Sequence, residues 1–140
     1  MPVKPAIIPA FRYADAPGAI RFLCDAFGFA EHAVYRDEKD PGLVHHAQIV
    51  LDGNMVMLSS VRDTDYSRKA GLKSVAEAGG NTLGIYVLID DVDGHADRAR
   101  AAGADIIMEP EDQDYGGRVY SARDSEGHVW SFGSYDPWAG

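Results

Sequence analysis

Two adjacent histidines, His45 and His46, resemble a catalytic or metal-binding pair. Imidazole groups coordinate metals and transfer protons near neutral pH. The residues around them predict a strand, in which neighbouring side chains point to opposite faces. We therefore expect only His46 to reach a cavity, where it either contacts a ligand or has a structural or solvated role.

The turn Asp52-Gly53 determines which side chains share a face with His46. Asp-Gly between two β-rich runs predicts a two-residue hairpin loop, in which Leu51 pairs with Asn54. Gln48 then faces Met57, because side chains alternate along each strand. The expected concave face carries His46, Gln48, Met55, Met57 and Ser59, and the face toward a helix carries Ala47, Ile49, Val56 and Leu58.

The second half of the chain predicts a similar face. Gly84 and Tyr86 share one side of a predicted strand. If Arg123 pairs with His128, Tyr120 lies opposite Ser131 and Trp130 points into the core. The predicted ligand-binding residues are His46, Gln48, Met57, Tyr86, Arg118, Tyr120 and Ser131. Such a mixture of aromatic, apolar and hydrogen-bonding groups suits a flat organic ligand or one of mixed polarity.

Two similar helices position these strands. The first is predicted from the N-cap Asp15 to Gly28, and the second from Asp91 to Gly103. Their landmarks lie about 75 residues apart, so the same strand–helix–strands unit occurs twice. The first unit covers about 5–60, with strands near 5–12, 30–36, 44–51 and 54–60. A linker covers about 61–80 and contains a short helix near 67–78. The second unit covers about 81–135, with strands near 82–89, 105–109, 118–123 and 128–133.

Composition excludes several function classes. The 140 residues include 22 acidic and 13 basic side chains, a net charge of −9, with no basic stripe of the kind that binds nucleic acid. No apolar run approaches the length of a membrane span, so we expect no membrane partner. The single cysteine, Cys24, favours a reducing, cytoplasmic location. No nucleophile motif is evident around it.

The order of these segments resembles the vicinal-oxygen-chelate superfamily, which includes glyoxalases, bleomycin-resistance proteins and extradiol dioxygenases. The segments that carry the resemblance span nearly the whole chain: Tyr13–Leu23 with Phe27-Gly-Phe29, His46-Ala-Gln before Asp52-Gly, Ile89-Asp-Asp-Val-Asp, and Arg123–Phe132. The resemblance implies an α+β fold of paired βαβββ modules, whose curled mixed sheets form a concave cavity, in a homodimer.

Metalloenzymes of this superfamily hold a divalent ion with His and Glu on the first and last strands of each module. The corresponding positions here are Ile8, Met57, Gly84 and Ser131. These residues cannot supply the nitrogen and carboxylate ligands of such a site, and neither can their immediate neighbours. We therefore expect no metal and no other cofactor.

The resemblance and the missing ligands favour a binding protein that holds a small organic molecule in a metal-free cavity, as in drug sequestration. The alternative is a lyase, isomerase or dioxygenase of the same superfamily. It would require a non-standard metal site, or acid–base chemistry by His46 and Tyr120.

Overall fold

The computed structural model describes residues 2–139, which form two four-stranded sheets. The first sheet has the order β1-β4-β3-β2, and the second has the order β5-β8-β7-β6. In each sheet the first strand of the module runs parallel to its neighbour, and the other pairings are antiparallel. The predicted α+β fold of paired βαβββ modules is confirmed. The strands are β1 (Ala10–Tyr13), β2 (Ala30–Arg36), β3 (Val44–Leu51), β4 (Asn54–Ser60), β5 (Gly84–Leu88), β6 (Asp105–Asp112), β7 (Arg118–Arg123) and β8 (Val129–Gly133).

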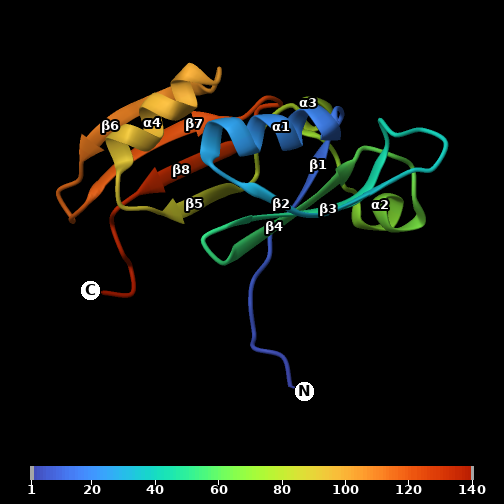
Figure 1. Cartoon of the computed structure of the whole chain (residues 1–140), viewed down its shortest axis with the longest axis horizontal. Coiled ribbons are helices and arrows are strands. Elements are labelled where there is room, and N and C mark those ends of the chain that lie inside the picture. The colour runs from blue at the N-terminus through green and yellow to red at the C-terminus, as the bar shows by residue number, and fades with distance from the viewer. Residues whose placement is uncertain (1, 140) are drawn as a thin grey trace.

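One long helix from each module covers the sheets. Helices α1 (Ala16–Phe27) and α4 (Val92–Ala101) pack against each other and lie side by side over the same side of the two sheets (Figure 1). The linker contains two short helices, α2 (Asp65–Ala70) and α3 (Val75–Ala78), instead of the single helix that the sequence predicts. Within residues 2–139, no helix is both long and apolar enough to cross a membrane.

Both long helices begin with the same capping arrangement. The carboxylates of Asp15 and Asp91 accept hydrogen bonds from the backbone N–H groups of Gly18 and Gly94, at 3.1 and 3.0 Å. A Cβ atom at either glycine would lie within 2.3 Å of the capping carboxylate. The two repeats therefore share an Asp-x-x-Gly cap, in which a side chain in place of the glycine would require the capping carboxylate to move.

The two hairpins differ in how well the sequence predicts their register. In the first, Leu51 pairs with Asn54 and Gln48 pairs with Met57, as predicted. In the second, Arg123 pairs with Val129 and not with His128, so the predicted register is wrong by one residue. A slip of one residue moves every side chain of a strand to the opposite face. Tyr120 consequently pairs with Phe132 and lies in the core.

The predicted boundaries are also corrected at two strands. Strand β1 begins at Ala10, so Ile8 lies two residues before it and not within it. Strand β6 continues to Asp112, beyond the predicted end at Glu109. The remaining strands lie within two residues of their expected limits.

The buried carboxylate of Asp124 joins the two modules. It accepts hydrogen bonds from the Tyr13 hydroxyl, at 2.5 Å, and from the Trp130 indole N–H, at 3.0 Å. Tyr13 belongs to β1 and Trp130 to β8, and neither side chain is exposed. Burial raises the pKa of Tyr13, and the Asp124 carboxylate raises it further. Trp130 also contacts the rings of Phe11, Phe27 and Phe29 from the first module, as expected of a core residue.

We predict that Tyr13→Phe lowers the free energy of unfolding by about 1.5–3 kcal/mol, because it removes a buried hydrogen bond to a carboxylate. Urea denaturation of the purified protein measures this change. Tyr35→Phe, at an exposed tyrosine of β2, is the matched control and is expected to change stability by no more than about 0.5 kcal/mol. Equal effects of the two substitutions would contradict a bridging role for Tyr13.

Candidate functional site

The open face of the first sheet forms a cavity of about 500 Å³, which we call the first-sheet cavity. Met57 lies near the middle of the sheet, paired with Ala10 on one side and Gln48 on the other. Arg12 pairs with Ser59, so both point to the same face as Met57. His46 approaches from β3. The first sheet therefore supplies an apolar floor with polar groups along its length.

The linker forms the remaining wall of this cavity. Arg62, Thr64, Tyr66 and Leu72 all line it. Thr64 begins α2 with a reciprocal cap, in which its hydroxyl accepts from the Ser67 N–H and the Ser67 hydroxyl accepts from the Thr64 N–H. Such a cap fixes the start of a helix that is too short to be stable alone. The wall is thus a defined element, although sequence analysis treats this segment as a connection.

The two histidines have different partners. The Nε2 atom of His46 lies 3.1 Å from the Gln48 side-chain amide. His45 hydrogen-bonds to the Asp37 carboxylate at 3.0 Å. Both histidines are among the residues that line the cavity, and the His45 ring is held by Asp37 outside the lining. The pairing of β2 with β3 is irregular between Tyr35 and Arg36, next to these histidines.

The other predicted site residues lie elsewhere. Gln48 contacts His46 but is not among the residues that line the first-sheet cavity. Tyr86 and Ser131 are paired neighbours on the open face of the second sheet, where the Ser131 hydroxyl is 2.6 Å from that of Ser121. The Tyr86 hydroxyl donates to the backbone carbonyl of Tyr135. The structure does not bring these second-sheet residues into the first-sheet cavity, whose lining comes from the first module and the linker.

Tyr120 and Arg118 do not face the predicted cavity. The Tyr120 side chain is fully buried, and its hydroxyl lies 2.5 Å from Nδ1 of His95. Arg118 forms ion pairs with Asp93 on α4 and with Asp112 on β6. The one-residue correction of the register between β7 and β8 accounts for both positions. His46 and Tyr120 therefore cannot form the acid–base pair that the enzymatic alternative requires.

His95 links the modules through both ring nitrogens. Its Nε2 atom lies 2.8 Å from the carbonyl oxygen of Phe27. Because a carbonyl can only accept, Nε2 carries the proton of the neutral ring and Nδ1 accepts from the Tyr120 hydroxyl. Burial lowers the pKa of His95, and burial raises the pKa of Tyr120. Both groups are therefore held neutral in a structural contact.

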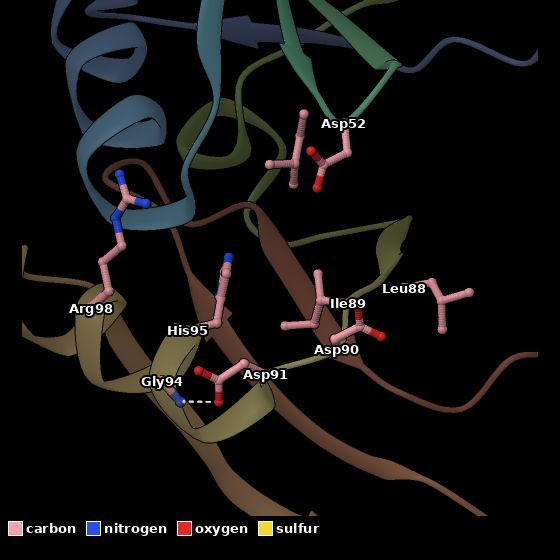
Figure 2. A pocket seen from close by; sticks show the side chains of 9 residues that line it. Asp52, Leu88, Ile89, Asp90, Asp91, Gly94, His95 and Arg98 are labelled. Carbon is pink, nitrogen blue, oxygen red and sulfur yellow. Dashed lines mark hydrogen bonds between the residues drawn. The ribbon is translucent and has the colours of Figure 1, made fainter.

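A second cavity, of about 600 Å³, lies between the turn at Asp52 and the start of α4 (Figure 2). Three of its polar groups are already committed to the fold, whereas the carboxylates of Asp52 and Asp90 are not. Asp91 caps Gly94, and His95 is held as described above. Arg98 donates to the backbone carbonyls of Cys24 and Asp25 at the end of α1. The basic groups of this cavity, His95 and Arg98, are therefore already engaged within the protein.

A third cavity, of about 660 Å³, lies between the modules and is mainly apolar. Met55 and Tyr86 line it, together with Trp138 and the N-terminal segment from Ala6 to Pro9. The N-terminal segment extends away from the sheets (Figure 1), and Ile7 is almost fully exposed.

The donor set does not fit a metal of the kind expected from the resemblance. Met57 lies on the open face of the first sheet beside Ala10, and Ser131 lies on that of the second sheet beside Tyr86. These side chains provide no imidazole or carboxylate donor. Within residues 2–139, no group of three or more His, Cys, Asp or Glu side chains gathers in a way that could hold a metal ion.

Comparison with known proteins identifies the family. The model of the Glyoxalase/Bleomycin resistance protein/Dioxygenase superfamily matches residues 9–132. The chain belongs to this superfamily. An uncharacterized protein from Mycobacterium bovis is 35% identical over 133 residues, which cover 94% of this chain and 84% of that protein.

Solved structures show the same fold. TioX from Micromonospora sp. ML1 is 29% identical, with a TM-score of 0.68 over 92% of this chain and 94% of that one. The fosfomycin resistance protein FosX from Mesorhizobium loti is 16% identical, with a TM-score of 0.64 over 98% and 97% of the two chains. The similarity to FosX concerns the fold alone.

The basic groups of the first-sheet cavity, Arg12 and Arg62, are not among the site residues predicted from the sequence. The strand predicted at 5–12 ends at Arg12, and Arg62 opens a segment interpreted as a linker. The signal that could have defined this wall is the Thr64-x-x-Ser67 cap, which predicts that a helix begins next to the end of β4.

We predict that His95→Gln lowers the free energy of unfolding by about 1–3 kcal/mol near neutral or weakly alkaline pH, through weaker buried hydrogen bonds. His95 has a lowered pKa in the fold, whereas in the unfolded chain it titrates near 6.5. As the pH falls below that value, protonation favours the unfolded chain. The native protein then loses the stability that neutral His95 contributes, and the difference in the free energy of unfolding between the native protein and the variant shrinks.

Urea denaturation of both proteins between about pH 5 and pH 8 measures this difference. His32→Gln, at an exposed histidine of β2, is the control and is expected to have little effect throughout this range. If the difference in the free energy of unfolding between the native protein and His95→Gln grows as the pH falls, His95 is not held neutral in the fold.

Proposed function

We propose that this protein binds a small organic molecule, aromatic or of mixed polarity, in the first-sheet cavity without a metal. The observation that carries the proposal is the composition of that cavity. Met57 and Leu72 offer an apolar surface, while His46 and Ser59 offer hydrogen-bonding groups. Its volume of about 500 Å³ lies in the usual range for small-molecule sites.

Sequestration is the form of activity that these features favour, as in drug resistance. The superfamily includes glyoxalases, bleomycin resistance proteins and dioxygenases. Holding a molecule requires only a complementary cavity, whereas metal-dependent catalysis requires donors that the positions of Met57 and Ser131 do not supply. The acid–base alternative is weakened because Tyr120 is buried against His95 and away from His46.

We predict that Met57→Trp weakens binding of the neutral fluorescent probe phenylnaphthylamine by about tenfold or more, because the larger ring fills the floor of the cavity. Fluorescence titration of the purified protein measures the affinity. Met108→Trp, at an exposed methionine of β6, is the matched control and is expected to leave binding unchanged. Absence of binding to the native protein, or equal binding by both variants, would count against this cavity as the site.

We also propose that the protein forms a homodimer through the apolar surface around the third cavity. Tyr86, Leu88 and Trp138 are exposed there, close to Ile7 and Ile8 of the N-terminal segment. Exposed apolar side chains gathered in one region are typical of protein–protein contacts. A second copy of the chain fits such a surface because it brings an equally apolar surface to the contact.

We predict that Leu88→Glu shifts the protein from dimer to monomer, because it places a charge within the apolar contact. Size-exclusion chromatography with light scattering measures the mass. Val3→Glu, at an exposed residue outside this surface, is expected to remain dimeric. A native protein that is monomeric at every concentration tested would refute the dimer.

A further inference from the structure

The charged groups of the first-sheet cavity are all basic, although the chain as a whole is acidic. The protein has 22 acidic and 13 basic residues. Nevertheless, the charged residues of the lining are Arg12 and Arg62, and within the described residues it contains no Asp or Glu. The nearby carboxylate of Asp37 contacts His45 from outside the lining. A local excess of positive charge attracts anions in a site where solvent is partly excluded.

Arg62 has a buried donor with no partner. Its Nε atom is inaccessible to solvent and forms no hydrogen bond within residues 2–139. A buried donor of this kind costs free energy unless an acceptor reaches it. The neighbouring carboxylate of Asp63 is engaged by Arg68 at 2.7 Å. The backbone carbonyl of Arg62 accepts from the Ser67 hydroxyl, which fixes the main chain at this position.

Arg12 supplies a second guanidinium to the same cavity. Its register opposite Ser59 places it on the open face of the sheet. One of its nitrogens, Nη1, donates to the backbone carbonyl of Ser60 at 3.3 Å. Neither Arg12 nor Arg62 forms an ion pair among the residues that the structure describes, whereas Arg68, Arg100, Arg118 and Arg123 each do.

We propose that the ligand of the first-sheet cavity is an organic anion, with a carboxylate or sulfonate group held by Arg62 and Arg12 and an apolar body packed on Met57, Tyr66 and Leu72. The inference rests on the proposed binding function and specifies its ligand class. Guanidinium groups form paired, charge-assisted hydrogen bonds with the oxygens of such acids. The inaccessible Nε of Arg62 takes no part in this contact, which falls to the terminal nitrogens of the guanidinium groups.

The test compares two fluorescent probes that differ by one acidic group: anilinonaphthalene sulfonate and the neutral phenylnaphthylamine. Binding is titrated at low salt and at about pH 8, where ordinary histidines are neutral. Arg62→Met is expected to weaken sulfonate binding by about tenfold while changing the affinity for the neutral probe less than about twofold. Arg62→Lys keeps the charge and is expected to bind the sulfonate probe more tightly than Arg62→Met does, but less tightly than the native protein does.

The matched control is Arg68→Met, which removes an exposed arginine of the same linker and is expected to alter neither affinity. If circular dichroism shows that Arg62→Met is unfolded, Arg12→Met is compared in the same way, with the same direction expected. An unchanged ratio of the two affinities in the folded variant would overturn the anion inference and leave the binding function standing. If the native protein binds neither probe, the anion inference and the proposed binding function are both overturned.

Discussion

The rest of the structure depends on the buried carboxylate of Asp124. It accepts hydrogen bonds from Tyr13 of the first module and Trp130 of the second, and from the backbone N–H groups of Glu126 and His128. A buried charge with this many donors is stabilised only while every partner remains in place. The adjacent Glu126 carboxylate in turn accepts from the backbone at the start of α1. One turn of the second module thereby fixes the position of β1 and the entry to α1.

The opposite end of α1 is also completed by the second module. Helix α1 has no basic residue in its last turn, where unpaired carbonyls leave partial negative charge. Arg98 and His95 of α4 donate to those carbonyls. The repeat therefore preserved the caps that each module needs for itself, such as Asp15 and Asp91. The contacts that join the modules come from residues that differ between the two copies.

The difference between the two hairpins explains why the sequence predicts one open face and not the other. Asp52 and Gly53 both have positive φ, of 47° and 80°, as a two-residue hairpin turn requires, and that turn chemistry can be recognised in the sequence. The second loop runs from Asp124 to His128. Its conformation is fixed by the buried Asp124 carboxylate, which accepts hydrogen bonds from the backbone N–H groups of Glu126 and His128. This tertiary contact cannot be inferred from local residue types. Consequently the positions of His46 and Met57 were predictable, whereas that of Tyr120 was not.

The scaffold can be predicted from local features of the sequence, whereas the charge of the cavity cannot. Helix caps, glycine stops and strand alternation are local features, and they were sufficient to predict the βαβββ units. The charge of the cavity is not local, because Arg12 and Arg62 are fifty residues apart and meet only when β1 pairs with β4. The Tyr13–Asp124 contact, one residue beyond Arg12, ties β1 to the second module. The second module therefore helps to position Arg12 in a cavity to which it contributes no lining residue.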